Sequence, residues 1–466
     1  MSSAFRTERD SLGTVNVPAD ALYGAQTQRA VENYPISGLR AHPALVEATV
    51  LIKRAAAIAN RDLGRLEPEI ADAIVAAADL VLGGAHRDQF VVDVYQAGAG
   101  TSHHMNVNEV LANLAADRLG EPRGVYIRVH PNDHVNMGQS TNDVFPSATR
   151  IALLQRSAEL VRAGRLLSAA LSAKANAFSG IVKTGRTHLQ DAVPVTLGQE
   201  FEGYAACIAR AVTEIEHAQD ALRELNLGAT AAGTGLNAGP EYVARALEVL
   251  NESTGLGLRT PDSYFRVTQS MGDVVAFMGA VRRLAVETGK IASDLRLLSM
   301  GPRAGIGEIV LPAVQPGSSI MPGKVNPSIP EMVNQVCFQV IGCDATVAAA
   351  GEAGQLELNV MMPVIAWNAL HAVGILSAAL TVFRERTIEG LAADETRCRE
   401  LLDRSTATAT ALSPHIGYAA TAELAKEAVR TGRPLRELVI EKGLLDEAAV
   451  DRILSAEAMT TPGVRR

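Results

Sequence analysis

The chain has 466 residues, more than one hydrophobic core usually serves, so we expect two or three domains around a large shared interior. With 47% hydrophobic and 20% charged residues, the composition is typical of a folded globular protein and excludes a disordered chain. The formal net charge of −8 disfavours non-specific attraction to nucleic acid or to anionic lipid, so we expect no nucleic-acid partner.

The cysteines and the N-terminus indicate the compartment. The four cysteines show no CxxC motif and no dense spacing, which favours reduced thiols over a disulfide framework or a zinc site. The N-terminal segment carries charged residues with no apolar block behind them, unlike a secretory signal. We therefore predict a cytoplasmic protein.

Helical spacing of apolar residues dominates the chain. It is clearest in residues 151–161, 212–225 and 281–298, where glycine and proline are scarce, so we predict unbroken helices of about 30 residues. Alternation typical of strands is confined to short pieces such as residues 125–129. The predicted fold class is mainly α, a bundle of long helices.

One apolar stretch, residues 358–383, carries no formal charge and is long enough to span a bilayer. It also contains Asn359, Pro363, Asn368 and His371, which a membrane span disfavours. We expect a helix buried at the centre of a bundle, and no membrane partner.

Four polar segments between the helices are richer in glycine, hydroxyl and amide groups than plain turns require. They are residues 98–106 (GAGTSHHMN), 130–143 (HPNDHVNMGQSTND), 184–191 (TGRTHLQD) and 317–327 (GSSIMPGKVNP). Domain boundaries are expected near the second segment and near residue 393, which gives predicted domains of 1–140, 141–393 and 394–466.

These segments are rich in hydrogen-bond donors, and two of them precede predicted helices. Ser140, Thr141 and Asn142 stand just before a long helical pattern, and Thr101 stands before a helix expected to start near Asn106. Unpaired N–H groups and the helix dipole favour an anion at such places. The same residues are also ordinary helix caps, and for any single segment taken alone we favour that reading.

The 317–327 loop combines serine hydroxyls with Lys324 and Asn326. It is not a nucleotide-binding P-loop, because five residues separate Gly317 from Gly323 and Val325 stands where a magnesium-binding hydroxyl belongs. Residues 233–239 likewise fail the dinucleotide pattern. Lys324 could form a Schiff base, but neutralising a bound anion is the commoner role of such a lysine.

Four histidines raise the question of a metal site: His103, His104, His130 and His134. Adjacent histidines point apart, whereas metal ligands must converge, so we expect no metal here.

Taken together, the four segments resemble the aspartase/fumarase superfamily. The 317–327 loop is similar to the superfamily's signature loop, and residues 130–137, 185–191 and 233–237 match in the expected order. Residues 189–194, 330–342 and 352–360 resemble the ammonia-lyase branch that acts on aspartate more than the fumarate hydratase branch.

The resemblance implies an architecture and a reaction. The fold would be a long-helix bundle with three domains, whose central bundle is shared in a homotetramer with active sites built from three chains. The reaction would be elimination of ammonia from L-aspartate to give fumarate. The substrate would be a small dicarboxylate, and no cofactor is expected. Donors packed around a carboxylate would stabilise the doubly charged aci form that follows proton removal.

The resemblance also assigns roles to residues of this chain. Ser318 matches the general base, assisted by Lys324. The carboxylate that becomes the aci form would be held by Thr101, Ser140, Thr141 and Ser319. Lys324 and Asn326 would bind the other carboxylate. Asn142, Thr187 and His188 would lie near the departing group, with Glu331 as a partner for His188.

Several positions depart from the family pattern. His104 stands where the family usually has asparagine, and Met362 stands where the aspartate branch typically has glutamate. Residues 267–273 resemble neither branch. The alternatives are therefore a fumarate hydratase, a lyase for another substituted succinate, and a non-catalytic scaffold; retention of the polar set argues against the last.

Overall fold

The computed structural model describes residues 5–461 and 463. The chain is mainly helical, which confirms the predicted fold class, and its packing defines two compact units. The first unit consists of the described residues up to Val161 together with Thr213–Arg283 and Phe338–Leu376. The second consists of Arg162–Val212, Leu284–Cys337 and the described residues from Ser377 onward. This division does not test the three-domain boundaries, which stay a prediction.

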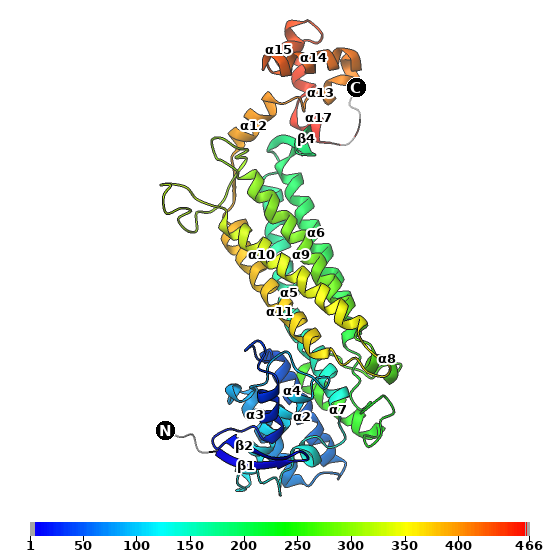
Figure 1. The fold of residues 1–466 in the computed structure, drawn as a ribbon. Coiled ribbons are helices and arrows are strands. Elements are labelled where there is room, and N and C mark those ends of the chain that lie inside the picture. Colours follow the sequence, from blue (N-terminus) through cyan, green and yellow to red (C-terminus); the bar gives the residue numbers. More distant parts are fainter. Residues whose placement is uncertain (1–4, 462, 464–466) are drawn as a thin grey trace. The chain divides into compact units, whose positions relative to one another are not determined.

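Five long helices run through both units (Figure 1). They are α5 (Thr141–Ala177), α6 (Leu197–Leu222), α9 (Gly272–Leu298), α10 (Ser328–Glu352) and α11 (Met362–Phe383). Their length agrees with the predicted unbroken helices, because hydrophobic periodicity is a local property that the sequence displays directly.

Polar contacts join these helices inside each unit. In the first unit, Arg150 of α5 forms a buried ion pair with Asp273 of α9, with 2.6 Å between Nε and Oδ2. In the second unit, Tyr204 of α6 donates a hydrogen bond to Asp294 of α9. Asn334 of α10 donates to the Gly289 carbonyl oxygen of α9. Helix α9 therefore contacts α5 in the first unit and contacts α6 and α10 in the second.

Within the described residues, one helical stretch, Met362–Ile388, is long and apolar enough to cross a membrane. Half of its most apolar window is buried inside the chain, and Ile365, Leu370 and Leu376 have no exposed surface. A core helix has the same length and composition, so this helix is weak evidence for a membrane protein.

The first unit also holds a cluster of shorter elements (Figure 1). Val50, Ile74 and Leu111 lie in its shared hydrophobic core. The elements are β1 (Phe5–Asp10), β2 (Gly13–Pro18), α1 (Ala25–Asn33), α2 (Pro43–Asp62), α3 (Pro68–Leu82), α4 (Thr101–Arg118), α7 (Pro240–Thr254) and α8 (Tyr264–Gln269), with single helical turns η1 (Arg87–Gln89) and η2 (Pro131–Val135). Strands β1 and β2 form an antiparallel hairpin.

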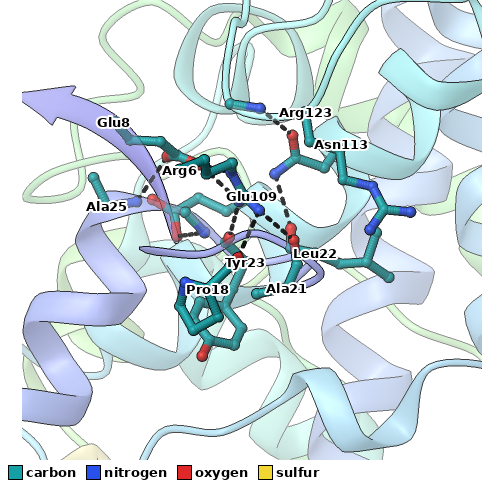
Figure 2. A network of polar contacts seen from close by, with 12 residues as sticks. Arg6, Glu8, Pro18, Ala21, Leu22, Tyr23, Ala25, Glu109, Asn113 and Arg123 are labelled. Atoms are coloured by element: carbon teal, nitrogen blue, oxygen red, sulfur yellow. Dashed lines mark hydrogen bonds and ion pairs between the residues drawn. The ribbon is translucent and has the colours of Figure 1, made fainter. Parts of the chain in front are cut away.

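A buried carboxylate ties the N-terminal elements to α4 (Figure 2). Glu109 accepts hydrogen bonds from the backbone N–H groups of Gly24, Gln26 and Thr27, which open α1, and from the Thr27 hydroxyl. Arg6 of β1 donates to four backbone carbonyl oxygens before α1 and pairs with Glu8. These buried polar groups thus satisfy one another's hydrogen bonds, and Glu109 joins the middle of α4 to the start of α1.

The remaining elements belong to the second unit. They are β3 (Val182–Thr187), β4 (Gln190–Thr196), β5 (Ile309–Val310), β6 (Ala392–Ala393), η3 (Arg384–Ile388), α12 (Glu395–Arg404), α13 (Ala409–Ile416), α14 (Tyr418–Thr431), α15 (Leu435–Glu441), α16 (Glu447–Ile453) and α17 (Ala456–Thr460). Helices α13 to α16 share a hydrophobic core of their own, which includes Leu412, Leu438 and Val450.

Two sequence predictions need correction. Residues 125–129 form no strand; the backbone N–H groups of Ile127 and Arg128 instead donate to the Glu121 carboxylate, which takes the place of a partner strand. Helix α4 starts at Thr101 rather than near Asn106, so Thr101 lies in its first turn. None of the four cysteines, all of which lie in the described residues, forms a disulfide, and Cys207 is exposed while the other three are buried.

Candidate active site

The first unit brings together two helix N-termini that carry predicted site residues. Thr101 opens α4 and Thr141 opens α5, and their Oγ1 atoms lie 3.2 Å apart. Ser140 and Asn142 flank Thr141, and the Asn142 N–H donates to the Ser140 Oγ. Of the two threonines, Thr101 is exposed and Thr141 is nearly buried. The positive ends of two helix dipoles and several hydroxyls thus lie together beside these threonines, an arrangement that favours binding of an anion.

Gly100 allows α4 and α5 to meet this closely. Its φ is +96°, in the left-handed region, and a Cβ there would lie 2.2 Å from Cδ2 of Phe145 in α5. A residue with a side chain would therefore meet both backbone strain and the Phe145 ring.

Buried Asp143 holds the start of α5 in place. Its carboxylate accepts hydrogen bonds from the N–H groups of Ser140, Gly228 and Thr230. Asn142 donates from its side chain to the Ala231 carbonyl oxygen. Burial raises the pKa of Asp143 to about 6, against the effect of its three backbone donors. The Ser140–Asn142 turn is therefore fixed by a second segment far away in the sequence.

A buried lysine lies behind the two threonines, and the sequence analysis missed it. Lys53 of α2 has no exposed surface. Its Nζ lies within hydrogen-bond distance of Asn136 Oδ1, Gln139 Oε1 and His104 Nε2. The sequence did indicate it, because Lys53 stands among the alanine, valine and isoleucine residues of a mostly apolar helix. A lysine in such a place is more readily explained by buried hydrogen-bond partners than by exposure to solvent.

The second unit presents Thr187 and His188 at the tip of the antiparallel β3–β4 hairpin. Both side chains are exposed. His188 and Leu189 have φ values of +56° and +58°, which non-glycine residues seldom adopt. Such strain concentrates at functional places and requires support from the surrounding structure.

That support is a buried ionic cluster below the hairpin tip. Glu308 has no exposed surface; it forms ion pairs with Arg186 at 2.9 Å and with Lys183 at 2.9 Å. Lys183 also pairs with Glu200 of α6. The hairpin is thereby fastened to the segment that leads into the 317–327 loop.

The 317–327 loop, also in the second unit, closes on itself. The Gly317 N–H donates to the Lys324 carbonyl oxygen, and the Asn326 side-chain amide donates to the Gly317 carbonyl oxygen. Inside the loop, Ser318 Oγ accepts hydrogen bonds from the backbone N–H groups of Ile320, at 3.2 Å, and Met321, at 3.0 Å. Two donors aimed at one hydroxyl oxygen would stabilise negative charge on it.

The other predicted residues of this unit do not converge within one chain. Ser319 and Lys324 are exposed on the loop. Glu331 lies in the first turn of α10. In the part of the chain that the structure describes, no hydrogen bond or ion pair joins Glu331 to His188. The first unit therefore carries the two helix N-termini, and the second carries the hairpin tip and the loop.

The four histidines do not converge on a metal. His103 Nε2 lies 3.1 Å from the Thr49 hydroxyl, and His104 Nε2 faces Lys53. His134 Nδ1 accepts a hydrogen bond from the His130 N–H. Across residues 5–461 and 463, no group of three or more histidine, cysteine, aspartate or glutamate side chains is placed to hold a metal ion.

Comparison with known proteins identifies the family. The profile described as "Lyase" matches residues 13–342, and that of the "Fumarase C C-terminus" matches residues 409–461. An aspartate ammonia-lyase of Bacillus sp. is 48% identical over 464 residues, which cover 100% of this chain and 99% of the relative. The chain belongs to the aspartase/fumarase superfamily of lyases.

Other relatives of this superfamily bear a different name. A class II fumarate hydratase of Halobacterium salinarum is 51% identical over 465 residues, covering 100% of this chain and 99% of the relative. A crystal structure titled fumarate lyase:delta crystallin, from Brucella melitensis and bound to cobalt, has 49% identity and a TM-score of 0.95. It covers 98% of this chain and matches along 100% of its own length. Family membership is therefore established at full length, while the relatives' names divide between two substrates.

Proposed function

We propose that this lyase eliminates ammonia from L-aspartate to give fumarate. Support comes from the relatives named aspartate ammonia-lyase, whose full-length similarity favours a carbon–nitrogen lyase. The observation that carries the proposal is the pair of backbone N–H groups directed at Ser318 Oγ. A serine is a poor base in water, and fixed donors would stabilise the alkoxide that takes the carbon-bound proton.

In the proposed reaction, Ser318 removes the proton from the carbon beside one carboxylate. The electron pair left behind spreads onto that carboxylate, and Thr101, Ser140, Thr141 and Ser319 donate to the resulting aci form. The pair then forms the new carbon–carbon double bond as ammonia departs near Asn142, Thr187 and His188. Lys324 and Asn326 bind the other carboxylate, with Glu331 beside His188.

We propose a cytoplasmic homotetramer whose chains share each site. The hairpin tip and the loop are exposed in a single chain, and they include apolar side chains such as Leu189 and Ile320, at 74% and 84% exposure. Exposed apolar residues beside polar reaction groups are typical of surfaces that a second chain covers. Sedimentation of the purified protein tests the tetramer, and a stable, active monomer would contradict it.

A second function, hydration of fumarate to malate, is favoured by the fumarate hydratase relative at 51% identity. The ammonium of aspartate already carries the proton with which it leaves, whereas the hydroxyl of malate must gain a proton to leave as water. The hydratase reaction therefore needs more acid assistance, and the groups around the departing atom decide between the two.

One assay separates these functions. Purified enzyme is incubated with L-aspartate, with L-malate, and with fumarate plus ammonia, while fumarate is followed by its ultraviolet absorbance. Formation of fumarate from aspartate supports the proposal. Turnover of malate alone rejects it in favour of the hydratase, and absence of turnover with every substrate favours the scaffold.

A further inference from the structure

A continuous line of polar contacts runs from the buried interior of the first unit to its surface. It starts at Lys53 Nζ, passes through the imidazole of His104, and reaches the hydroxyls of Thr141 and then Thr101. Lys53 and His104 are both buried, whereas Thr101 is exposed. The proposed reaction uses the two threonines but assigns nothing to the two residues behind them.

The orientation of the surrounding amides determines what Lys53 meets. Asn136 donates from Nδ2 to the Gln139 carbonyl oxygen, and Gln139 donates from Nε2 to the carbonyl oxygens of Val135 and Met137. Both side-chain oxygens are therefore left to face Lys53, each 2.9 Å from Nζ. An ammonium has three donors and no acceptor, so the third N–H goes to His104 Nε2.

The tautomer of His104 follows from that contact. With Nε2 accepting from Lys53, the neutral ring carries its proton on Nδ1. Nδ1 lies 2.8 Å from Thr141 Oγ1, so Nδ1–H donates and the threonine oxygen accepts. The Thr101 hydroxyl is already committed to the Gly98 carbonyl oxygen at 2.6 Å. The Thr141 proton then has two acceptors open to it, the Thr101 oxygen at 3.2 Å and a ligand outside the chain.

We propose that Lys53 and His104 are positioning residues, which fix the Thr141 hydroxyl as a hydrogen-bond donor toward the substrate carboxylate. The inference rests on the proposed function, since it concerns the carboxylate that becomes the aci form. A donor fixed before the reaction costs no reorganisation when negative charge develops.

The hydrogen bonds along this line can also run in the opposite direction, from Thr141 through His104 to Lys53. Burial lowers the pKa of Lys53 well below its ordinary value, against the charge of Asp143. A neutral amine would accept from His104 Nε2–H, the ring would accept from Thr141, and the hydroxyl would turn inward. The two arrangements require opposite groups at position 104, a donor or an acceptor facing Thr141.

An isosteric pair of variants distinguishes them. His104→Asn presents an N–H to Thr141. His104→Asp presents only an acceptor there, while its charge pairs with Lys53 and keeps the site folded. We expect His104→Asn to retain kcat/KM, and His104→Asp to lose about ten- to hundredfold, as for one hydrogen bond to a charged group. The loss should fall mainly on kcat, because the charge grows in the transition state.

Two controls separate positioning from other effects. In a Thr141→Val background, the difference between Asn and Asp at position 104 should disappear, because the hydroxyl through which it acts is gone. His103→Leu removes a neighbouring buried imidazole that contacts Thr49 rather than Thr141. It should lower thermal stability but leave kcat/KM near that of the wild type.

The outcomes are distinct. Equal activity of the Asn and Asp variants, greater activity of the Asp variant, or persistence of their difference without the Thr141 hydroxyl would overturn the positioning role. Failure of the wild type to act on aspartate, malate or fumarate would instead refute the proposed function. In that case calorimetric binding of succinate to the same variants still tests the orientation of Thr141, and equal affinities would overturn it.

Discussion

Replacing Gly100 by alanine tests whether the close approach of α4 and α5 builds the anion site. The new Cβ would lie 2.2 to 2.6 Å from three atoms of the Phe145 ring. That ring is 1% exposed and packs edge-on against His103, so it cannot swing aside. Forcing a methyl group into such packing costs about 1–3 kcal/mol. The left-handed backbone adds about 1–2 kcal/mol.

The same helix supplies a matched control. Gly120 follows the C-terminal end of α4 with a φ of +74°, and a Cβ there would meet no atom within 4 Å. Gly120→Ala should therefore cost only the backbone part, about 1–2 kcal/mol. The difference between the two variants isolates the contact with Phe145.

Urea denaturation of both variants measures the free energies of unfolding. Steady-state kinetics with aspartate measure KM and kcat, which report on the site. We expect Gly100→Ala to lose about 2–5 kcal/mol of stability. We also expect a raised KM, because Thr101 moves away from Thr141. Equal losses of stability in the two variants, or unchanged kinetics in Gly100→Ala, would refute the reasoning.

Three further predictions concern the base, the hairpin and the response to acid. Ser318→Ala should lower kcat about a hundred- to ten-thousandfold with unchanged thermal stability, and near-normal turnover would exclude Ser318 as the base. Glu308→Gln should cost about 3–5 kcal/mol in urea denaturation, because two cations lose a buried partner. Glu69→Gln, at an exposed pair, should cost at most about 1 kcal/mol, and equal costs would contradict the argument. Burial lowers the pKa of His103 to about 4, so only the unfolded chain binds this proton below the ordinary value of 6.5. Stability should therefore fall as the pH drops from 6.5 toward 4, by about 2 kcal/mol at pH 5, and His103→Gln should remove that part of the slope.

The long helices could be predicted from the sequence because each displays its own periodicity. The β3–β4 hairpin could not, because its turn consists of His188 and Leu189 rather than the glycine or asparagine that usually marks one. The strain is supported by Glu308, which lies more than a hundred residues further along the chain.

For the candidate site, the sequence indicated some of the residues, and their roles stay predictions. Segments rich in donors indicated Thr101, Ser140 and Ser318, because helix N-termini and glycine-rich loops have a local signature. Lys53 and Asp143 were missed as supports, since their partners at Gln139 and Gly228 are 86 and 85 residues away. Buried charges of this kind are defined by tertiary neighbours, which spacing along a sequence does not reveal.

The contacts around Ser318 have a consequence for turnover. The two N–H groups that face its oxygen belong to Ile320 and Met321, two and three residues further along the same loop. In the proposed reaction, a displacement of the loop that lets product escape would therefore carry the serine and its two backbone donors together. Only the distance between Ser318 and the substrate would then change. The loop could open and close in each cycle while the hydrogen bonds to the serine oxygen stay formed.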